Sequence, residues 1–292
     1  MQKRLIVLFL IVSLFCVSGC APKREQAQIA ATTMPVYCFT SRLCQGTPIT
    51  VSRLVTENVS CLHDYTLQVD QMRAIENAEL VVISGAGLEE FLHDAIHGKE
   101  VLEAAEGMSL LEGGHDHDHD HSGHVHAEDP HIWLSPENAK MMAHNICHGL
   151  EEKYPQYAHI FEENLKALEA DLDALQDYGE QALADLACRE IITFHDGFSY
   201  LAESFDLTIA EAVEEESGSE ASAKELIHLI EIVREHNLPA IFVEANGSTS
   251  AASIISAETG VKVYTLDMAM AGEDYFEAMY HNIDTLKEAL GK

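Results

Sequence analysis

The chain has 292 residues, enough for one large domain or two ordinary ones, and its 47% hydrophobic and 23% charged content is ordinary for a globular protein. Its charge balance is unusual, because 49 acidic residues stand against 17 basic ones, for a formal net charge of −32. This balance argues against nucleic acid and anionic lipid headgroups as partners, since both are bound by clusters of Lys and Arg, and it favours attraction of cations.

The first twenty residues predict export and a lipid anchor. Two basic residues precede an apolar run over residues 5–17, which is shorter than the roughly 20 residues that a transmembrane helix needs. Small residues then lead to Cys20 in a pattern that resembles the lipobox of bacterial lipoproteins, whose cysteine carries the lipid. We therefore expect residues 1–20 to be a lipoprotein signal peptide and residues 21–26 a tether. The alternative is an ordinary cleaved signal with an incidental cysteine.

The first half of the mature chain alternates predicted strands and helices. We expect strands over residues 28–33, 49–55 and 80–84, and helices over residues 34–43, 69–77, 88–97 and 136–150. Strands separated by helices at this spacing predict βαβ units and a parallel sheet.

A long helix is predicted over residues 156–187, which contain no proline and one glycine. Its apolar residues recur at spacings of four and three, as one face of a helix requires: Phe161, Leu165, Leu168, Leu172 and Leu175. It is either a simple core helix or coiled coil, or a rigid beam between two lobes, and its central position favours the beam.

The second half repeats the alternation. Strands are expected over residues 190–194, 207–213, 240–244 and 261–267, and helices up to residue 204 and over residues 223–236, 248–259 and 275–290, with an acidic loop at 214–220. The predicted fold class is therefore α/β, with two lobes, 27–155 and 188–292, each a mainly parallel sheet flanked by helices, joined by one long rigid helix.

The cysteines give little information on disulfide bonds or metal binding. Beyond the signal peptide the chain has five: Cys38, Cys44, Cys61, Cys147 and Cys188. Their number is odd and none stands in a C-x-x-C pair, so the sequence predicts neither a disulfide pattern nor a cysteine zinc site. A local bridge from Cys61 to Cys38 or Cys44 and free buried cysteines remain alternatives.

Residues 113–126 form a histidine-rich loop in which histidines alternate with aspartates and small residues. Its histidines are His115, His117, His119, His121, His124 and His126. Neutral imidazole is a common ligand for transition metals, so we expect a metal-collecting arm that binds additional Zn²⁺ weakly. The alternative is a solvated polar loop.

Three histidines outside this loop, His63, His131 and His195, stand after strands or in short loops, where α/β folds place ligand residues, and Asp267 ends the last strand. Alone, each is equally readable as a satisfied polar residue or a helix cap. Together they offer two ligands per lobe, and three imidazoles with one carboxylate make a tetrahedral set suited to Zn²⁺. The remaining histidines, including the i,i+4 pairs His93/His97 and His144/His148, fall in helical runs and are expected on the surface.

Several segments resemble one family along nearly the whole mature chain: ATTMPVY, LHDYTLQVDQM, ELVVISGAGLEEF, DPHIWLSPENA, ITFHDGFSYLAESF and IFVEANGS, together with the histidine-rich loop and the final strand. The family is that of zinc- and manganese-binding solute receptors of bacterial ABC importers, in particular the high-affinity zinc-binding lipoproteins. The resemblance implies metal held between two lobes by His63, His131, His195 and Asp267. It also implies delivery to a membrane permease powered by a cytoplasmic ATPase.

This sequence departs from the family pattern twice. Leu62 replaces a proline that many members carry before the first histidine, and Met268-Ala269 follows Asp267 in place of the usual Pro-Leu. The fourth ligand is therefore Asp267 or water. Related manganese receptors usually carry a carboxylate where this chain has His195, and a third imidazole favours Zn²⁺ over Mn²⁺.

The predicted function is capture of Zn²⁺ at the extracytoplasmic or periplasmic face by a monomer that meets the membrane only through its N-terminal lipid. A metal buffer or surface adhesin without a transport role is the alternative. A zinc hydrolase is disfavoured, because four protein ligands leave no open coordination position and the sequence has no H-E-x-x-H motif, so no enzymatic activity is expected.

Overall fold

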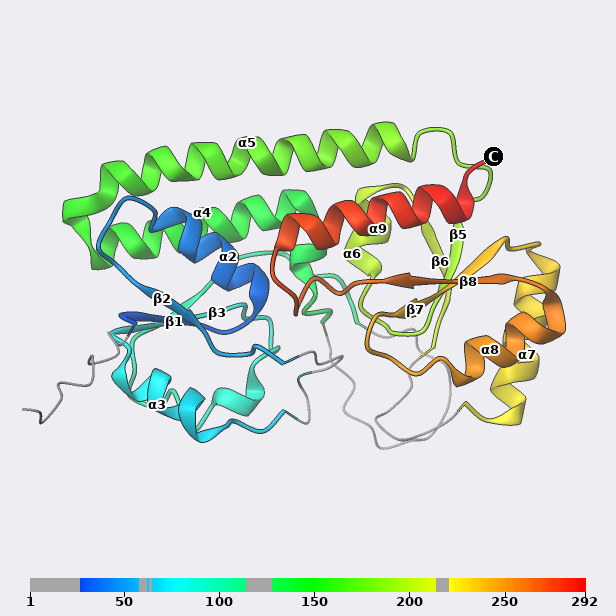
Figure 1. Cartoon of the computed structure of the whole chain (residues 1–292), viewed down its shortest axis with the longest axis horizontal. Coiled ribbons are helices and arrows are strands. Elements are labelled where there is room, and N and C mark those ends of the chain that lie inside the picture. The colour runs from blue at the N-terminus through cyan, green and yellow to red at the C-terminus, as the bar shows by residue number, and fades with distance from the viewer. Residues whose placement is uncertain (1–26, 58–61, 63–64, 114–127, 214–220) are drawn as a thin grey trace, which may run out of the picture.

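The computed structural model describes residues 27–57, 62, 65–113, 128–213 and 221–292. In this part of the chain two four-stranded parallel sheets lie toward the two ends of an elongated molecule (Figure 1). The N-terminal sheet has the order β2 (Val51–Arg53), β1 (Ile29–Ala31), β3 (Leu80–Ile83), β4 (Val101–Glu103). The C-terminal sheet has the order β6 (Thr208–Ala212), β5 (Glu190–Thr193), β7 (Ala240–Glu244), β8 (Lys262–Leu266). The predicted two-lobed α/β class is confirmed.

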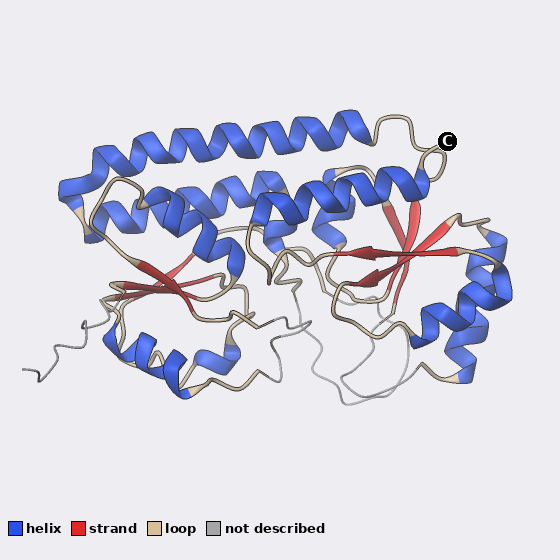
Figure 2. Cartoon of the chain, in the orientation of Figure 1, coloured by secondary structure: helices blue, strands red, loops and turns tan. Residues whose placement is uncertain are grey.

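Helices cover both sheets (Figure 2). In the N-terminal lobe these are α2 (Met34–Leu43), α3 (Val69–Asn77) and α4 (Pro136–Lys153), and in the C-terminal lobe α6 (Ser199–Ser204), α7 (Ala223–Glu235), α8 (Ser250–Thr259) and α9 (Tyr275–Leu290). Local sequence fixes several of their ends. The Ser135 hydroxyl accepts a hydrogen bond from the Asn138 amide at the start of α4, and Ser222 with Glu225 forms a capping box at α7. Helix α8 ends at Gly260, whose φ of 79° suits glycine.

Helix α5 (Ala158–Ala182) runs along one side of both lobes and packs against α2, α4 and α9. All five residues of its predicted apolar stripe are buried, and its packing against helices of both lobes agrees with the predicted beam. The helix is shorter than the predicted 156–187. The Arg189 guanidinium donates to the carbonyls of Leu183 and Ala184 just after its end, and the amides of Ala187 and Cys188 donate to the Leu290 carbonyl. These contacts stabilise a turn where the sequence alone favours helix.

One hydrophobic core runs through both lobes. The Phe39 ring of the N-terminal lobe meets the edge of the Tyr275 ring of the C-terminal lobe, with centroids 5.0 Å apart. The Trp133 indole N–H donates to the Met268 carbonyl over 2.7 Å, and the Tyr275 hydroxyl donates to the Trp133 carbonyl over 2.7 Å. Phe39, Trp133 and Tyr275 have no exposed surface. Exposing each such ring costs about 1.5–3 kcal/mol, so the two lobes keep a fixed relative orientation.

The predicted helix over residues 88–97 is wrong. Only Glu90–Leu92 is helical there, as a 3-10 turn, and turns surround it. Gly85, Ala86 and Gly87 all have positive φ, and the Glu89 carboxylate turns back to accept hydrogen bonds from the amides of Ser84 and Gly85. The short strand β4 was not predicted, because its three residues are half-exposed or exposed at a sheet edge and lack an apolar pattern.

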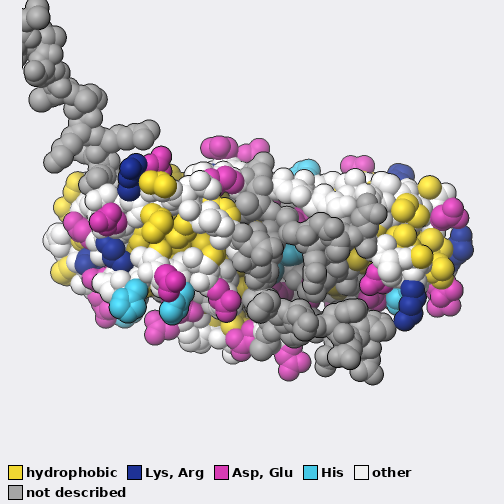
Figure 3. All heavy atoms as spheres, turned by 90° about the horizontal axis from the view of Figure 1, so that it is seen from below, with side chains coloured by type: hydrophobic (Ala, Val, Ile, Leu, Met, Phe, Trp, Pro, Cys, Tyr) yellow, Lys and Arg dark blue, Asp and Glu magenta, His cyan; other side chains and the backbone are white. Residues whose placement is uncertain are grey.

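Four described cysteines are free, namely Cys38, Cys44, Cys147 and Cys188. Cys61 lies outside the described residues. Also outside them lie the predicted signal and tether with Cys20, His63, the histidines of the loop and the acidic segment 214–220. No helix among the described residues is both long and apolar enough to cross a membrane. Acidic side chains are spread over the face seen in Figure 3, and basic ones are few.

Candidate metal site

The site lies where strands of the C-terminal sheet end and a loop of the N-terminal lobe meets them. His195 follows β5 by two residues, Glu244 is the last residue of β7, and Asp267 directly follows β8. Thr193 pairs with Phe242 across β5 and β7, so continuing the same register places His195 beside Glu244. From the other lobe, His131 directly precedes the 3-10 turn η2 (Ile132–Leu134).

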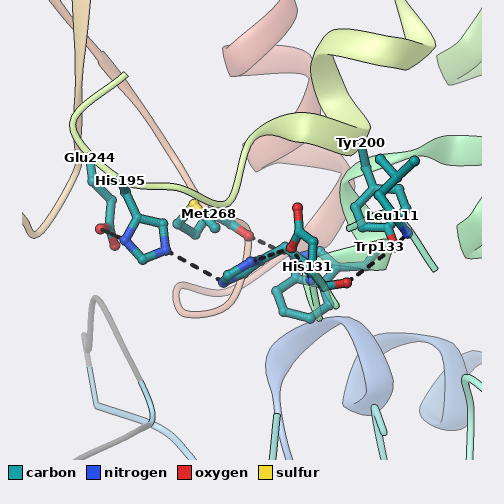
Figure 4. Close-up of polar contacts among 8 residues, drawn as sticks. Leu111, His131, Trp133, His195, Tyr200, Glu244 and Met268 are labelled. Atoms are coloured by element: carbon teal, nitrogen blue, oxygen red, sulfur yellow. Dashed lines mark hydrogen bonds and ion pairs between the residues drawn. The ribbon is translucent and has the colours of Figure 1, made fainter. Parts of the chain in front are cut away.

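The structure brings His131 and His195 together (Figure 4). Their Nε2 atoms are 3.5 Å apart, and the rings meet edge to face with centroids 5.2 Å apart. Two nitrogens that each lie ~2.0–2.1 Å from a tetrahedral zinc ion are about 3.3–3.4 Å apart. The two imidazoles are therefore already spaced almost as two ligands of one metal ion.

Each imidazole has a carboxylate at its other ring nitrogen. Asp129 Oδ1 lies 2.8 Å from His131 Nδ1 and also accepts a hydrogen bond from the His131 amide, while Glu244 Oε2 lies 3.6 Å from His195 Nδ1. A carboxylate at Nδ1 favours the tautomer that carries its proton there, which leaves the Nε2 lone pair free. With both protons on Nδ1, the two Nε2 lone pairs would face one another over 3.5 Å, an arrangement that a cation between them stabilises.

The loop that carries His131 is held from the C-terminal lobe. The Tyr200 hydroxyl on α6 donates to the Asp129 carbonyl over 3.1 Å and accepts from the Leu111 amide over 2.9 Å. Burial raises the pKa of Tyr200 to about 12, so this hydroxyl stays neutral. Asp129 itself is only 3% exposed. His131 is consequently fixed before any metal arrives.

The two imidazole rings fit only because Gly197 has no side chain. A Cβ at this position would lie 2.7 Å from His195 Cδ2, 2.7 Å from Met268 Cε and 2.8 Å from His131 Nδ1. Met268 is 3% exposed, and the Trp133 ring packs edge to face against His131 at 5.5 Å. The walls of the site are therefore close and apolar, which limits the access of water.

Acidic groups lie on the C-terminal side. In the metal-free protein, burial, and then the charge of Asp267, raises the pKa of Glu244 to about 8, and a cation bound at His195 favours the ionised carboxylate. Asn282 fixes the backbone of Asp267 by accepting from its amide and donating to its carbonyl, each over 2.7 Å, and Asp267 Oδ1 accepts from the Ala269 amide. Among the described residues no three His, Cys, Asp or Glu side chains form a group that could hold a metal ion. Asp267 is thus not joined to the two imidazoles, His63 lies outside the described residues, and the four-ligand set stays a prediction.

Sequence reasoning missed four residues of this site: Asp129, Glu244, Gly197 and Met268. Glu244 did carry a signal, because a single acid ends the otherwise apolar strand AIFVE. The other described histidines lie on the surface as predicted, although His93 and His97 lie in turns and not in a helix. His93 and His148 have highly exposed side chains, and His144, also exposed, pairs with Glu169 over 2.5 Å.

Residues 29–289 match the model of the ZnuA family, described as the periplasmic component A of a zinc-uptake complex. The chain belongs to this family. The putative metal-binding protein of Treponema pallidum (strain Nichols) is 29% identical over all of this chain and 98% of that protein. The zinc-binding lipoprotein AdcA of Streptococcus pneumoniae serotype 4 is 30% identical over 99% of this chain but 61% of AdcA, so the chain spans about three fifths of that relative.

The crystal structure of a ZnuA deletion mutant with zinc bound superposes with a TM-score of 0.78 at 30% identity, over 92% of this chain and 99% of that one. The family assignment and the shared fold confirm the expectation of a metal-binding receptor for ABC-type import. This ZnuA family is a class of transport receptors and not of enzymes.

Proposed function

We propose that this ZnuA-family chain captures Zn²⁺ between its lobes through His131 and His195, with His63 and Asp267 completing the coordination, and delivers it to the permease of an ABC importer. The supporting observation is that two imidazoles from different lobes turn their Nε2 atoms toward one another at 3.5 Å, each with a carboxylate at Nδ1. Imidazole-rich sites favour Zn²⁺ over Mn²⁺, which prefers oxygen ligands.

Capture proceeds in a site whose parts are largely in position. The incoming cation binds the two Nε2 atoms, and the carboxylates of Asp129 and Glu244 at the opposite ring nitrogens stabilise its positive charge. Because the lobes share a core, binding relies on movements of the loops around the site and not on a large rotation of one lobe. With all four positions taken by the protein, no coordination site stays open for a hydrolytic substrate, so we expect no enzymatic activity.

The test compares the zinc content and zinc affinity of the mature protein with those of His131→Ala and His195→Ala. His93→Ala is the matched control, because the His93 side chain is 86% exposed and far from any predicted ligand in the sequence. We expect one tight site in the wild type and in His93→Ala, and its loss in the other two variants. Tight binding that survives both substitutions would contradict the assignment.

The anchor and the partner need tests in cells. We infer that Cys20 carries the lipid and that residues 21–26 tether the receptor as a monomer to the outer side of the cell membrane. A strain that lacks the protein should grow poorly when zinc is limiting, and the wild-type gene should restore growth. A metal buffer or an adhesin would leave that growth unchanged, which separates the alternatives.

The histidine-rich loop is assigned an accessory role, in which His115, His117, His119, His121, His124 and His126 raise the local concentration of Zn²⁺. Deletion of residues 113–126 should remove weak binding and leave one tight site. Loss of the tight site in this deletion would show that the loop supplies a ligand.

A further inference from the structure

Glu244 is an acid in a position that is costly for an acid. It is 4% exposed, at the end of a strand whose five residues are all buried. Burying a carboxylate costs several kcal/mol unless it has a partner. Its neighbour across the strand register is His195, and the Oε2–Nδ1 distance is 3.6 Å (Figure 4).

The same arrangement occurs in the other lobe. Asp129 is 3% exposed and lies 2.8 Å from His131 Nδ1. The four groups thus form a row of carboxylate, imidazole, imidazole and carboxylate, with one half of the row from each lobe. The two halves differ in how closely the carboxylate approaches Nδ1, which is 2.8 Å for Asp129 and 3.6 Å for Glu244.

We propose that Glu244 is the positioning residue of the C-terminal imidazole, and that it keeps the proton of His195 on Nδ1 so that Nε2 faces the metal. This inference rests on the proposed function, since it assigns a role beside a ligand of that site. Outer carboxylates of this kind orient metal-bound imidazoles and increase their basicity, and their loss typically weakens binding by about 10- to 100-fold.

The experiment measures zinc affinity of the mature protein by competition with a chromophoric chelator, for the wild type, Glu244→Gln and Glu211→Gln. Glu211 is a matched control, because it is a mostly buried acid of the same lobe, on the outer strand β6. Its carboxylate lies 3.8 Å from the ring of another histidine, His228 in α7. We expect zinc binding about 10- to 100-fold weaker in Glu244→Gln and unchanged in Glu211→Gln, with the melting temperatures of the metal-free proteins alike.

A second readout reports the tautomer of His195 directly, independently of zinc affinity. Nitrogen-15 chemical shifts of the His195 ring in the wild type should report the Nδ1–H tautomer, and Glu244→Gln should shift the population toward Nε2–H. An Nε2–H tautomer in the wild type, or equal affinities for Glu244→Gln and the wild type, would overturn the inference. If His195→Ala abolishes binding while Glu244→Gln does not weaken it, only this inference fails. If His195→Ala binds normally, the proposed site itself fails.

Discussion

Gly197→Ala adds one methyl group beside the two imidazoles, and we expect this group to disrupt the metal site. That group would lie within 2.8 Å of His131 Nδ1, His195 Cδ2 and Met268 Cε, although ordinary contacts begin near 3.4 Å. The Met268 side chain can move, but both rings are held by carboxylates, so a ring must retreat by about 0.6–0.7 Å. Coordination tolerates about 0.2 Å, so one zinc–nitrogen bond is lost or badly misaligned. We expect zinc binding at least about 100-fold weaker, which corresponds to about 2.7 kcal/mol.

The assay is a chelator competition, run beside thermal unfolding of the metal-free protein. Gly149→Ala is the control. Gly149 lies in α4, about 20 Å along the helix from its start near His131. A Cβ at Gly149 would overlap the Leu102 side chain and would not touch the metal site. Gly149→Ala should lower the melting temperature and leave zinc affinity intact, whereas Gly197→Ala should do the reverse. Wild-type affinity in Gly197→Ala would refute the claim that the rings bind metal in the positions described.

Three further results are expected. Asp129→Asn should weaken zinc binding by about 10- to 100-fold in the same competition assay, because His131 loses the carboxylate at Nδ1. Leu168→Ala should lower the free energy of unfolding in urea by about 2–5 kcal/mol, since Leu168 is fully buried in the stripe of α5. Burial raises the pKa of Glu89 from 4.5 to about 7, so the folded chain binds more protons than the unfolded chain between these values. The contribution of Glu89 to stability should therefore fall as pH rises from about 5 to 8, and thermal unfolding of Glu89→Gln should lack this slope.

The elements that the sequence predicted best are those whose pattern is local and long. The stripe of α5 repeats over four turns, and every one of its five residues is buried as its spacing requires. The predicted helix at 88–97 failed for a reason that no local pattern contains. The Glu89 carboxylate accepts hydrogen bonds from the loop before it and from the Thr32 hydroxyl, at 2.6 Å. Thr32 lies 57 residues earlier in the chain.

The site divides in the same way. His131 and His195 were identifiable because a histidine at the end of a strand or beside a short turn is a local feature. Their carboxylate partners differ in this respect. Asp129 is two residues from His131, whereas Glu244 reaches His195 only through the register of β5 and β7, which the sequence does not specify.

The connections between the lobes also explain how a rigid receptor can hold a metal that it must later release. Trp133 and Met268 join the lobes directly beside the imidazoles, and Tyr275 joins them again within the same core. Opening the site by rotating one lobe would break both hydrogen bonds and expose three buried side chains, at a cost of several kcal/mol. Metal entry and release are therefore expected through movements of the side chains at the site, without rotation of a lobe.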